Sequence, residues 1–367
     1  MKKSILLLGS VFCASFGAPV SAQSTEFKIA PGVAGTFYGQ INLTFQSVDD
    51  GTQSYSDFVD NSNSTSRLGF RIESTMDGND FMFNFETGLG FKNTSETSQA
   101  DTLDWFDWQD TDIRKFEISY SGSFGKFWLG QGSMATDGAA EIDNSGTSIV
   151  GYVNLADTAG SYLFRHAGVL SDISIGDTFK DLDGGRRFRL RYDTPSLSGV
   201  TVSIAYGEEV LNENDDSEYY DTALRYKYDD STFGFDAAIG YSWKYFDGET
   251  TEYLVTSGTV MHKPSGANLT LAAGNNQNGD GNYWYAKLGW QGDLIRQGST
   301  AISVDYYDGA DFELAGSSSE SWGIQAVQRF DDLNLEAYLG YRVYAYNDSI
   351  ASYQDLDALL VGARWKF

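Results

Sequence analysis

The chain has 367 residues, with 40 glycines, 4 prolines and 15% aromatic residues, and its 51 acidic and 25 basic residues give a formal charge of −26. The many aromatic residues argue against disorder, and the acidic balance argues against nucleic-acid binding, which needs basic surfaces. Frequent glycine with little proline favours many strands joined by tight turns.

The first 22 residues are predicted to be a secretory signal peptide. Lys2 and Lys3 precede an apolar run that is too short to span a bilayer, and the small residues that follow suit cleavage after Ala22. The mature domain, residues 23–367, would have a formal charge of −28. It would contain no cysteine, because Cys13 lies in the signal peptide, so no disulfide can hold it together.

Sixteen strands are predicted, because segments that alternate between apolar and polar side chains recur between turns. In the first of them, Phe37 and Phe45 share one face while Gln40 and Asn42 share the other. No later apolar run approaches the roughly 20 residues of a membrane helix. The stretch 160–180 could hide further strands. The sixteen strands are expected to begin near residues 36, 66, 81, 113, 126, 186, 200, 219, 233, 251, 267, 282, 299, 320, 334 and 356.

The closing segment Leu356–Phe367, LDALLVGARWKF, indicates where these strands lie. Apolar residues occupy every second position up to Phe367, and Arg364 and Lys366 fall on the other face. This pattern is typical of outer-membrane barrels, although an edge strand of a soluble sandwich also alternates. With short turns alternating with longer loops, the sequence predicts an all-β fold, a 16-stranded antiparallel transmembrane β-barrel.

One connection, residues 134–184, is far longer than the roughly 15 residues that ordinary loops reach, so it is expected to be functional. Its apolar residues need burial. On the strands, basic side chains should face the lumen, because facing lipid would cost about 2–4 kcal/mol each. The predicted basic residues of the lumen wall are Arg67, Arg71, Lys115, Arg187, Arg189, Arg191, Arg342 and Arg364.

Signals for catalysis and for metal binding are poor. His166 and His262 are the histidines of the chain, and the mature chain has no cysteine nucleophile, so no enzyme is expected. Asn276, Asn278 and Asp280 resemble the start of a calcium loop, but Lys287 stands where the bidentate glutamate belongs. No cofactor or metal site is therefore expected, apart from weak calcium binding by the acidic loops.

Three segments and the terminal Phe367 resemble the general diffusion porins of Gram-negative outer membranes, particularly those of alphaproteobacterial type. The segments are Ser66–Leu89, FGKFWLGQG at Phe124–Gly132, and Arg189–Gly207. The resemblance implies a homotrimer in the outer membrane that lets ions and small hydrophilic solutes diffuse passively. It also implies contact with lipid and lipopolysaccharide, and recognition of Phe367 by the barrel-assembly machinery.

The same resemblance implies that the loop 134–184 folds inward as a constriction, facing a ladder formed by Arg67, Arg71, Lys115 and Arg189. A further basic residue that the family often has on the first strand is missing here. By analogy, the aromatic loop 101–112 would latch onto a neighbouring subunit. The acids implied to line the constriction are Asp137, Glu141, Asp143 and Asp157.

Two alternatives share this fold: a porin selective for sugars or phosphate, and a non-conducting adhesin. An aromatic track on the lumen face would favour sugars, and five tyrosines hint at one: Tyr283, Tyr285, Tyr338, Tyr344 and Tyr346. The sign of ion selectivity stays open, because the total charge favours cations and the wall arginines favour anions. Pore diameter and preferred solute are not predicted.

Overall fold

The computed structural model describes residues 25–100, 103–212 and 214–367. The predicted signal peptide, residues 1–22, lies outside the described residues, as do residues 101–102 of the aromatic loop. None of the described helices is long and apolar enough to cross a membrane.

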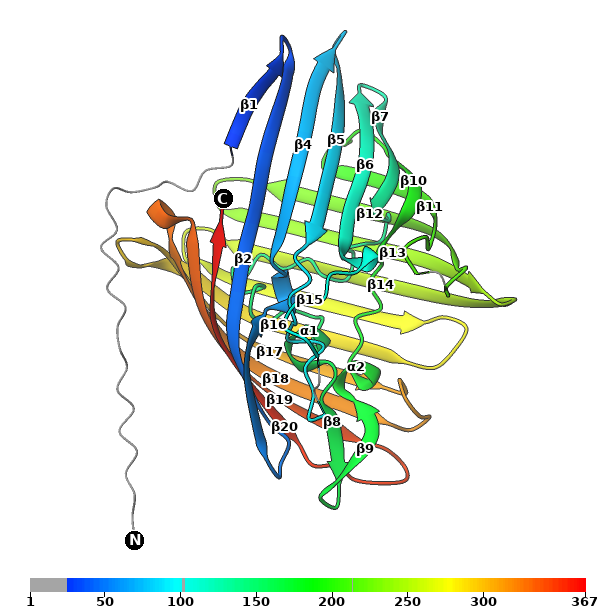
Figure 1. The fold of residues 1–367 in the computed structure, drawn as a ribbon, viewed down its shortest axis with the longest axis vertical. Coiled ribbons are helices and arrows are strands. Elements are labelled where there is room, and N and C mark those ends of the chain that lie inside the picture. Colours follow the sequence, from blue (N-terminus) through cyan, green and yellow to red (C-terminus); the bar gives the residue numbers. More distant parts are fainter. Residues whose placement is uncertain (1–24, 101–102, 213) are drawn as a thin grey trace.

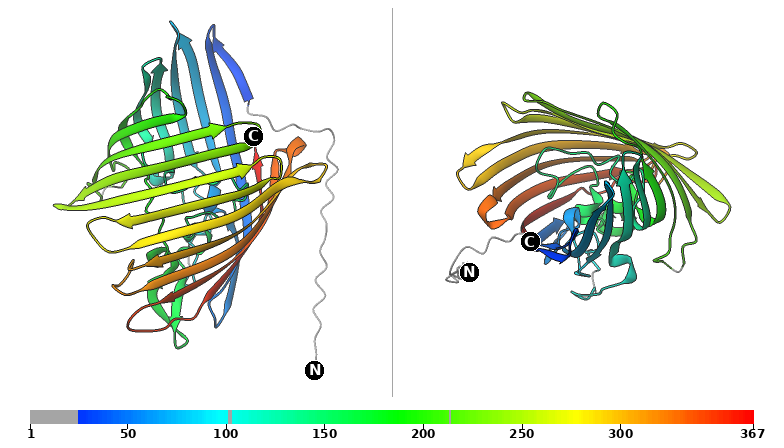
Figure 2. Two further views of the ribbon diagram at one scale, coloured as in Figure 1. Left: turned by 180° about the vertical axis from the view of Figure 1, so that it is seen from behind. Right: turned by 90° about the horizontal axis from the view of Figure 1, so that it is seen from above.

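Sixteen antiparallel strands form a closed barrel, which confirms the predicted fold class (Figures 1 and 2). The barrel closes where β2 pairs with β20, from Gln40 opposite Lys366 to Asp49 opposite Asp357. Each strand starts within three residues of its predicted position. The wall strands are β2 (Val33–Asp49), β4 (Arg67–Met76), β5 (Asn79–Gly88), β6 (Ile113–Gly122), β7 (Gly125–Ser133), β10 (Arg186–Asp193), β11 (Val200–Glu208), β12 (Glu218–Asp229), β13 (Phe233–Phe246), β14 (Glu249–His262), β15 (Ala267–Asn276), β16 (Asn282–Ile295), β17 (Gly298–Ala310), β18 (Ser318–Phe330), β19 (Leu335–Asn347) and β20 (Leu356–Lys366).

The outer surface of the wall is apolar, as the alternation predicts. On β10, Phe188 and Leu190 are exposed while Arg189 between them is buried on the inner side. On β20, Val361 and Trp365 are exposed in the same way. A belt of exposed apolar side chains around a polar interior is the arrangement that a lipid bilayer requires of a barrel.

Two strands of the wall were not predicted. β1 (Thr25–Ala30) pairs with the first part of β2, and β3 (Ser54–Asp60) pairs with its last part. A 3₁₀ turn, η1 (Ser62–Ser64), separates β3 from β4, so that both lie on the same side of β2. The sequence of β3, SYSDFVD, is polar enough to be mistaken for a loop. Two further 3₁₀ turns are η2 (Asp110–Asp112) and η3 (Asp331–Leu333).

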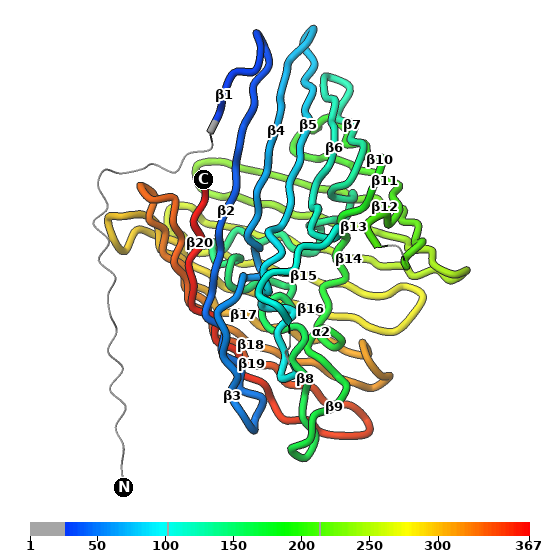
Figure 3. Tube along the Cα trace, viewed as in Figure 1, coloured from blue at the N-terminus to red at the C-terminus, as the bar shows by residue number. Residues whose placement is uncertain are grey.

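The long connection between β7 and β10 folds against the inside of the barrel (Figure 3). It contains four short elements: α1 (Ala156–Ala159), β8 (Leu163–His166), β9 (Val169–Ser174) and α2 (Ile175–Thr178). The hairpin β8–β9 lies in the stretch 160–180, where the sequence pattern allows further strands. Its Arg165 forms a buried ion pair with Asp50 in the turn between β2 and β3, at 2.7 Å.

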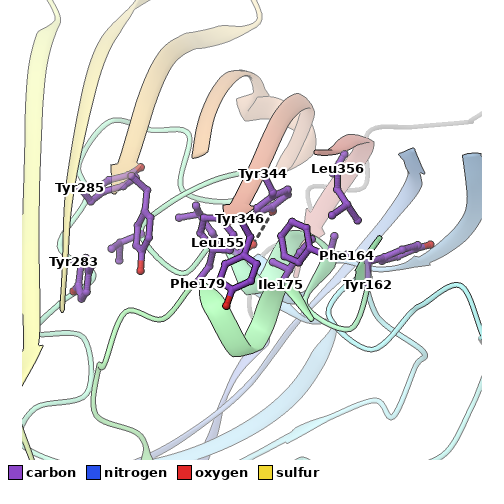
Figure 4. Packing of buried hydrophobic residues seen from close by; sticks show 14 of the residues in the cluster. Leu155, Tyr162, Phe164, Ile175, Phe179, Tyr283, Tyr285, Tyr344, Tyr346 and Leu356 are labelled. Carbon is purple, nitrogen blue, oxygen red and sulfur yellow. Dashed lines mark hydrogen bonds between the residues drawn. The ribbon is translucent and has the colours of Figure 1, made fainter. Parts of the chain in front are cut away.

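The apolar residues of this loop form a core with inward-facing residues of the wall (Figure 4). Leu155 and Phe179 of the loop are about 1% exposed, and the Phe179 ring lies 5.2 Å from the ring of Tyr344 on β19. The Tyr344 hydroxyl donates a hydrogen bond to the Leu155 carbonyl at 2.8 Å. The barrel interior is therefore partly filled by a packed loop, as its apolar content predicts.

Candidate functional site

The loop is fixed to one side of the barrel by polar contacts that follow the wall from strand to strand. The Ala139 carbonyl accepts a hydrogen bond from Ser257 on β14 at 2.7 Å. Farther along, the Thr147 hydroxyl lies 2.7 Å from that of Ser303 on β17. Glycines allow the loop to turn, since Gly146 has a φ of +81° that other residues rarely adopt. The loop thus covers the inner faces of β12–β19 and leaves the opposite side open.

A cavity of about 590 Å³ lies between the loop and the uncovered wall. Half-buried acidic side chains of the loop line one side of it, and arginines of the wall line the other. The strand break at η1 adds polar side chains to the wall. The charged residues of its lining are Asp137, Glu141 and Asp157 from the loop, and Arg67, Arg114, Arg186 and Arg364 from the wall.

The acids of the loop are crowded together. Oxygen atoms of Asp137, Glu141 and Asp183 all lie within 4.8 Å of one another, the one group of described residues close enough to share a cation. Burial and the neighbouring carboxylate of Asp183 raise the pKa of Glu141 well above its usual range. Burial raises the pKa of Asp157 to about 7, although the Tyr152 hydroxyl donates a hydrogen bond to it at 2.6 Å. Protons therefore neutralise part of this side near neutral pH.

The wall arginines are held by hydrogen bonds and by two carboxylates. Arg114 Nε lies 2.8 Å from Glu86, which is also 3.8 Å from Arg67 Nε. Arg364 pairs with Glu336 at 2.5 Å and donates to the Ser64 hydroxyl of η1 at 2.8 Å. These contacts fix the guanidinium groups of Arg67, Arg114 and Arg364 at the cavity surface.

Two of the four wall arginines were missed from the sequence. Alternation along β6 puts Lys115 inside and Arg114 outside with Phe116. A bulge in the pairing of β5 with β6 inserts Arg114 as an extra residue and turns it to the lumen, because bulges re-aim side chains. Arg186 is the first residue of β10, where the loop ends and strand alternation has not yet begun. The glycine pair before Arg186 was the available signal.

Three predicted residues lie in buried ion pairs and do not line this cavity. Asp143 contacts Lys287 on β16 at 2.7 Å, with side chains 3% and 0% exposed. Arg189 is 2% exposed and contacts Glu117 at 2.5 Å. Arg342 lies 2.7 Å from Asp305 beneath the loop. The Asp143 pair joins the loop to the wall, whereas the other two pairs join strands of the wall to each other.

The remaining predicted basic residues lie away from this cavity. Arg187 lines an adjoining cavity of about 340 Å³ and lies over the ring of Tyr219, 4.1 Å from its centre. Arg191 donates to the carbonyl groups of residues 133 and 134 and so braces the start of the loop. Arg71 is half-exposed, 3.9 Å from Glu73. Lys115 stands opposite Glu86 in the sheet, one position from the bulge.

The predicted aromatic track does not form an open surface. Tyr283, Tyr285, Tyr344 and Tyr346 are at most 3% exposed and pack under the loop (Figure 4). Tyr338 is 4% exposed and donates a hydrogen bond to Asn42. A solute in the cavity therefore meets charged and hydroxyl groups more than aromatic rings.

Residues 9–349 match the model of a Gram-negative porin family. No similar sequence was found among curated proteins. The match spans nearly all of the barrel, from the first wall strand to the end of β19.

Solved structures with the same fold are distant in sequence. The anion-selective porin from Comamonas acidovorans superimposes with a TM-score of 0.61 at 16% identity, covering 91% of this chain and 100% of its own. The outer-membrane channel DcaP of Acinetobacter baumannii gives 0.59 at 10% identity, covering 93% and 99%. OmpF of Salmonella typhi, solved with daunomycin, gives 0.55 at 15% identity, covering 94% and 100%.

Proposed function

Because this chain belongs to the Gram-negative porins, we propose that its barrel sorts small hydrophilic solutes by size and charge at the cavity between the loop and the arginine wall. The family and the fold make it a passive diffusion channel of the bacterial outer membrane. They point to a channel and not to an enzyme.

The observation that carries the proposal is the separation of charge across the cavity. Asp137, Glu141 and Asp157 line the loop side, and four arginines line the wall. Opposed fixed charges create a field across a narrow passage, which favours hydrated polar solutes because aligning their dipoles is favourable and stripping their water is costly. The loop 134–184 would thus act as the constriction.

Selectivity for sugars is the weaker alternative. Sugar-binding surfaces need accessible aromatic rings, and the tyrosines that suggested such a track are buried under the loop. A non-conducting adhesin has no need of a charged internal cavity of this size.

The assembly that we propose is a homotrimer. OmpT of Vibrio cholerae, which has the same fold at 14% identity, has been solved in a trimer form. In the described part of the loop between β5 and β6, Trp105 and Phe106 are 45% and 61% exposed, which suits a latch onto a neighbouring subunit.

Contacts with lipid, lipopolysaccharide and the barrel-assembly machinery belong to the same proposal. The apolar outer wall supports the contact with lipid. For the assembly machinery, the support is Phe367, whose backbone exchanges two hydrogen bonds with Gly39 of β2 at 2.9 and 3.1 Å, next to the barrel seam.

Weak calcium binding by the acidic outer loops is a further part of the proposal. Its support is the density of acidic residues in these loops. The candidate ligand Asn278, in the loop after β15, uses its side-chain amide to bond to the backbone of residues 250 and 252.

Swelling of liposomes that contain the purified protein tests the proposal. Uncharged sugars of increasing size should permeate at rates that fall smoothly with size. Permeation that depends on the identity of the sugar at equal size would instead support a sugar-selective channel, and no permeation from inserted, folded protein would support the adhesin.

A further inference from the structure

Four guanidinium groups converge on one side of the 590 Å³ cavity. Arg67, Arg114, Arg186 and Arg364 come from β4, β6, β10 and β20, and all four line the cavity. The other three are close enough to Arg67 to repel its charge. A protein with a formal charge of −26 thus concentrates positive charge at one point of its interior.

The carboxylates within ion-pair distance do not balance these charges. In the described ranges, Glu86 serves both Arg114 at 2.8 Å and Arg67 at 3.8 Å. Glu336 forms ion pairs with Arg364, Arg329 and Lys366, so its single negative charge is shared among three cations. Four guanidinium groups against two shared carboxylates leave an excess of positive charge at the cavity surface.

The Arg186 guanidinium group has hydrogen-bond donors without a partner among the described residues. Its side chain makes no hydrogen bond or ion pair with the described residues, and its Nε is shielded from solvent without a partner. Arg67 is nearly as free, since its contacts are the long one to Glu86 and a 3.4 Å hydrogen bond to the Thr65 carbonyl. Leaving buried donors of a charged group unpaired is costly, so a ligand that pairs them binds favourably.

We propose that Arg67, Arg114 and Arg186, with the hydroxyls of Ser64 and Thr65, form a binding station for a small tetrahedral oxyanion, represented by inorganic phosphate. The planar fork of a guanidinium group matches two oxygens of such an anion, and hydroxyl groups can donate to the others. The inference rests on the proposed function, because the anion reaches the station through the channel.

The acids across the cavity would repel an oxyanion, but the charge of Glu141 and Asp157 is reduced. Crowding and burial raise the pKa of Glu141 well above its usual range, and burial raises that of Asp157 to about 7. Asp181, Arg114 and Arg186 also act on the Asp157 carboxyl, and Tyr152 donates to it. Arginine stays protonated throughout this pH range. Near neutral pH, the arginine side therefore prevails over the loop side.

The two adjoining cavities share arginines with the station but do not add to its excess of positive charge. The cavity of about 340 Å³ shares Arg114 and Arg186 and adds Arg187. A third cavity, of about 390 Å³, shares Arg364 and adds basic side chains at positions 227, 263 and 329. Each adjoining cavity also contains as many acids as bases, so among these three cavities the excess of positive charge is confined to the first, with four arginines and three acids.

Block of the chloride current by phosphate in a planar bilayer tests the station. In KCl solution, added inorganic phosphate should reduce the wild-type current with saturation. Arg186→Gln should raise the half-blocking concentration at least about tenfold, because a charge-assisted hydrogen-bonding pair is lost. Arg296→Gln is the matched control, since Arg296 is an exposed arginine in the turn between β16 and β17, outside the cavities described.

The possible outcomes distinguish failure of the proposed oxyanion station from failure of the proposed channel function. A phosphate shift no larger in Arg186→Gln than in Arg296→Gln would overturn the station, as would equal block by acetate, which lacks the tetrahedral oxygens. A wild-type protein that is folded and inserted but carries no KCl current would overturn the channel itself. If Arg186→Gln does not fold, Arg186→Lys decides, because it keeps the charge but loses the fork and should also weaken the block.

Discussion

Lys287 controls the part of the loop that borders the cavity. Its Nζ lies 2.7 Å from Asp143 Oδ2 and 2.6 Å from the Gly151 carbonyl, and its side chain is fully buried. These contacts, at residues 143 and 151, lie close in sequence to the loop residues 148, 149 and 152 that line the cavity. Replacing Lys287 by Met would leave the Asp143 carboxylate buried with one backbone donor, from Ser145.

The expected cost follows from the burial of the pair. Removing one partner of a buried ion pair typically costs about 3–5 kcal/mol. If the loop relieves this cost by undocking, the ratio of docked to undocked segment falls by about two to three and a half powers of ten. The aromatic core and the Arg165–Asp50 pair still hold residues 153–179, so the change should stay within residues 143–152.

Single-channel recording is the assay for Lys287→Met. The variant should show a larger open-channel conductance or added current noise, because the segment beside the cavity becomes mobile. The double variant Lys287→Met with Asp143→Leu is the control, since an apolar pair in place of a buried ion pair is often neutral or stabilising, and it should return towards wild-type behaviour. Unchanged conductance and noise in Lys287→Met would refute the idea that this ion pair docks the loop.

Three further predictions concern charge, docking and closure. The pKa of Asp157 is raised to about 7, so this carboxyl is protonated below neutral pH and ionised above it. The potassium-to-chloride permeability ratio should therefore rise from pH 6 to pH 8, and Asp157→Asn should flatten that rise. An identical pH profile in the variant would contradict this role of Asp157. Arg165→Leu removes the partner of buried Asp50 at a cost of about 3–5 kcal/mol and should expose the β8–β9 hairpin to added protease, whereas continued resistance would count against this contact. Gly39→Ala places a Cβ 2.7 Å from the Phe367 ring and 2.7 Å from the Arg67 carbonyl oxygen. It should lower the folded fraction on heat-modifiability gels relative to the control Gly234→Ala, whose Cβ would make ordinary van der Waals contacts. Equal folding of the two variants would argue against tight packing where the barrel closes.

The strands of the wall could be predicted because a membrane barrel imposes one rule on each of them. A side chain faces either lipid or lumen, so Phe188 and Arg189 already reveal the orientation of β10 in the sequence. The same rule fails where the backbone departs from regular pairing. The bulge beside Glu86 turns Arg114 inward against the alternation. The strand β3 was not predicted because its sequence is polar.

The candidate site was harder to predict than the wall, because alternation gives the face of a residue and not its depth. Arg189 and Arg342 do face inward, but tertiary packing covers them and pairs them with Glu117 and Asp305. Which inward residues stay open depends on where the loop lies. That path is set by contacts between residues more than a hundred positions apart, such as Asp143 with Lys287, which no local pattern encodes.

The most direct test of the account is single-channel conductance of purified, refolded protein in a planar bilayer under a gradient of KCl. The account predicts discrete conductance steps and a reversal potential that changes when Arg67 and Arg364 are neutralised together, because both line the passage and arginine stays charged. Protein that is folded and inserted but carries no current, or a reversal potential that does not change in this arginine variant, would contradict a channel constricted between the loop and the arginine wall.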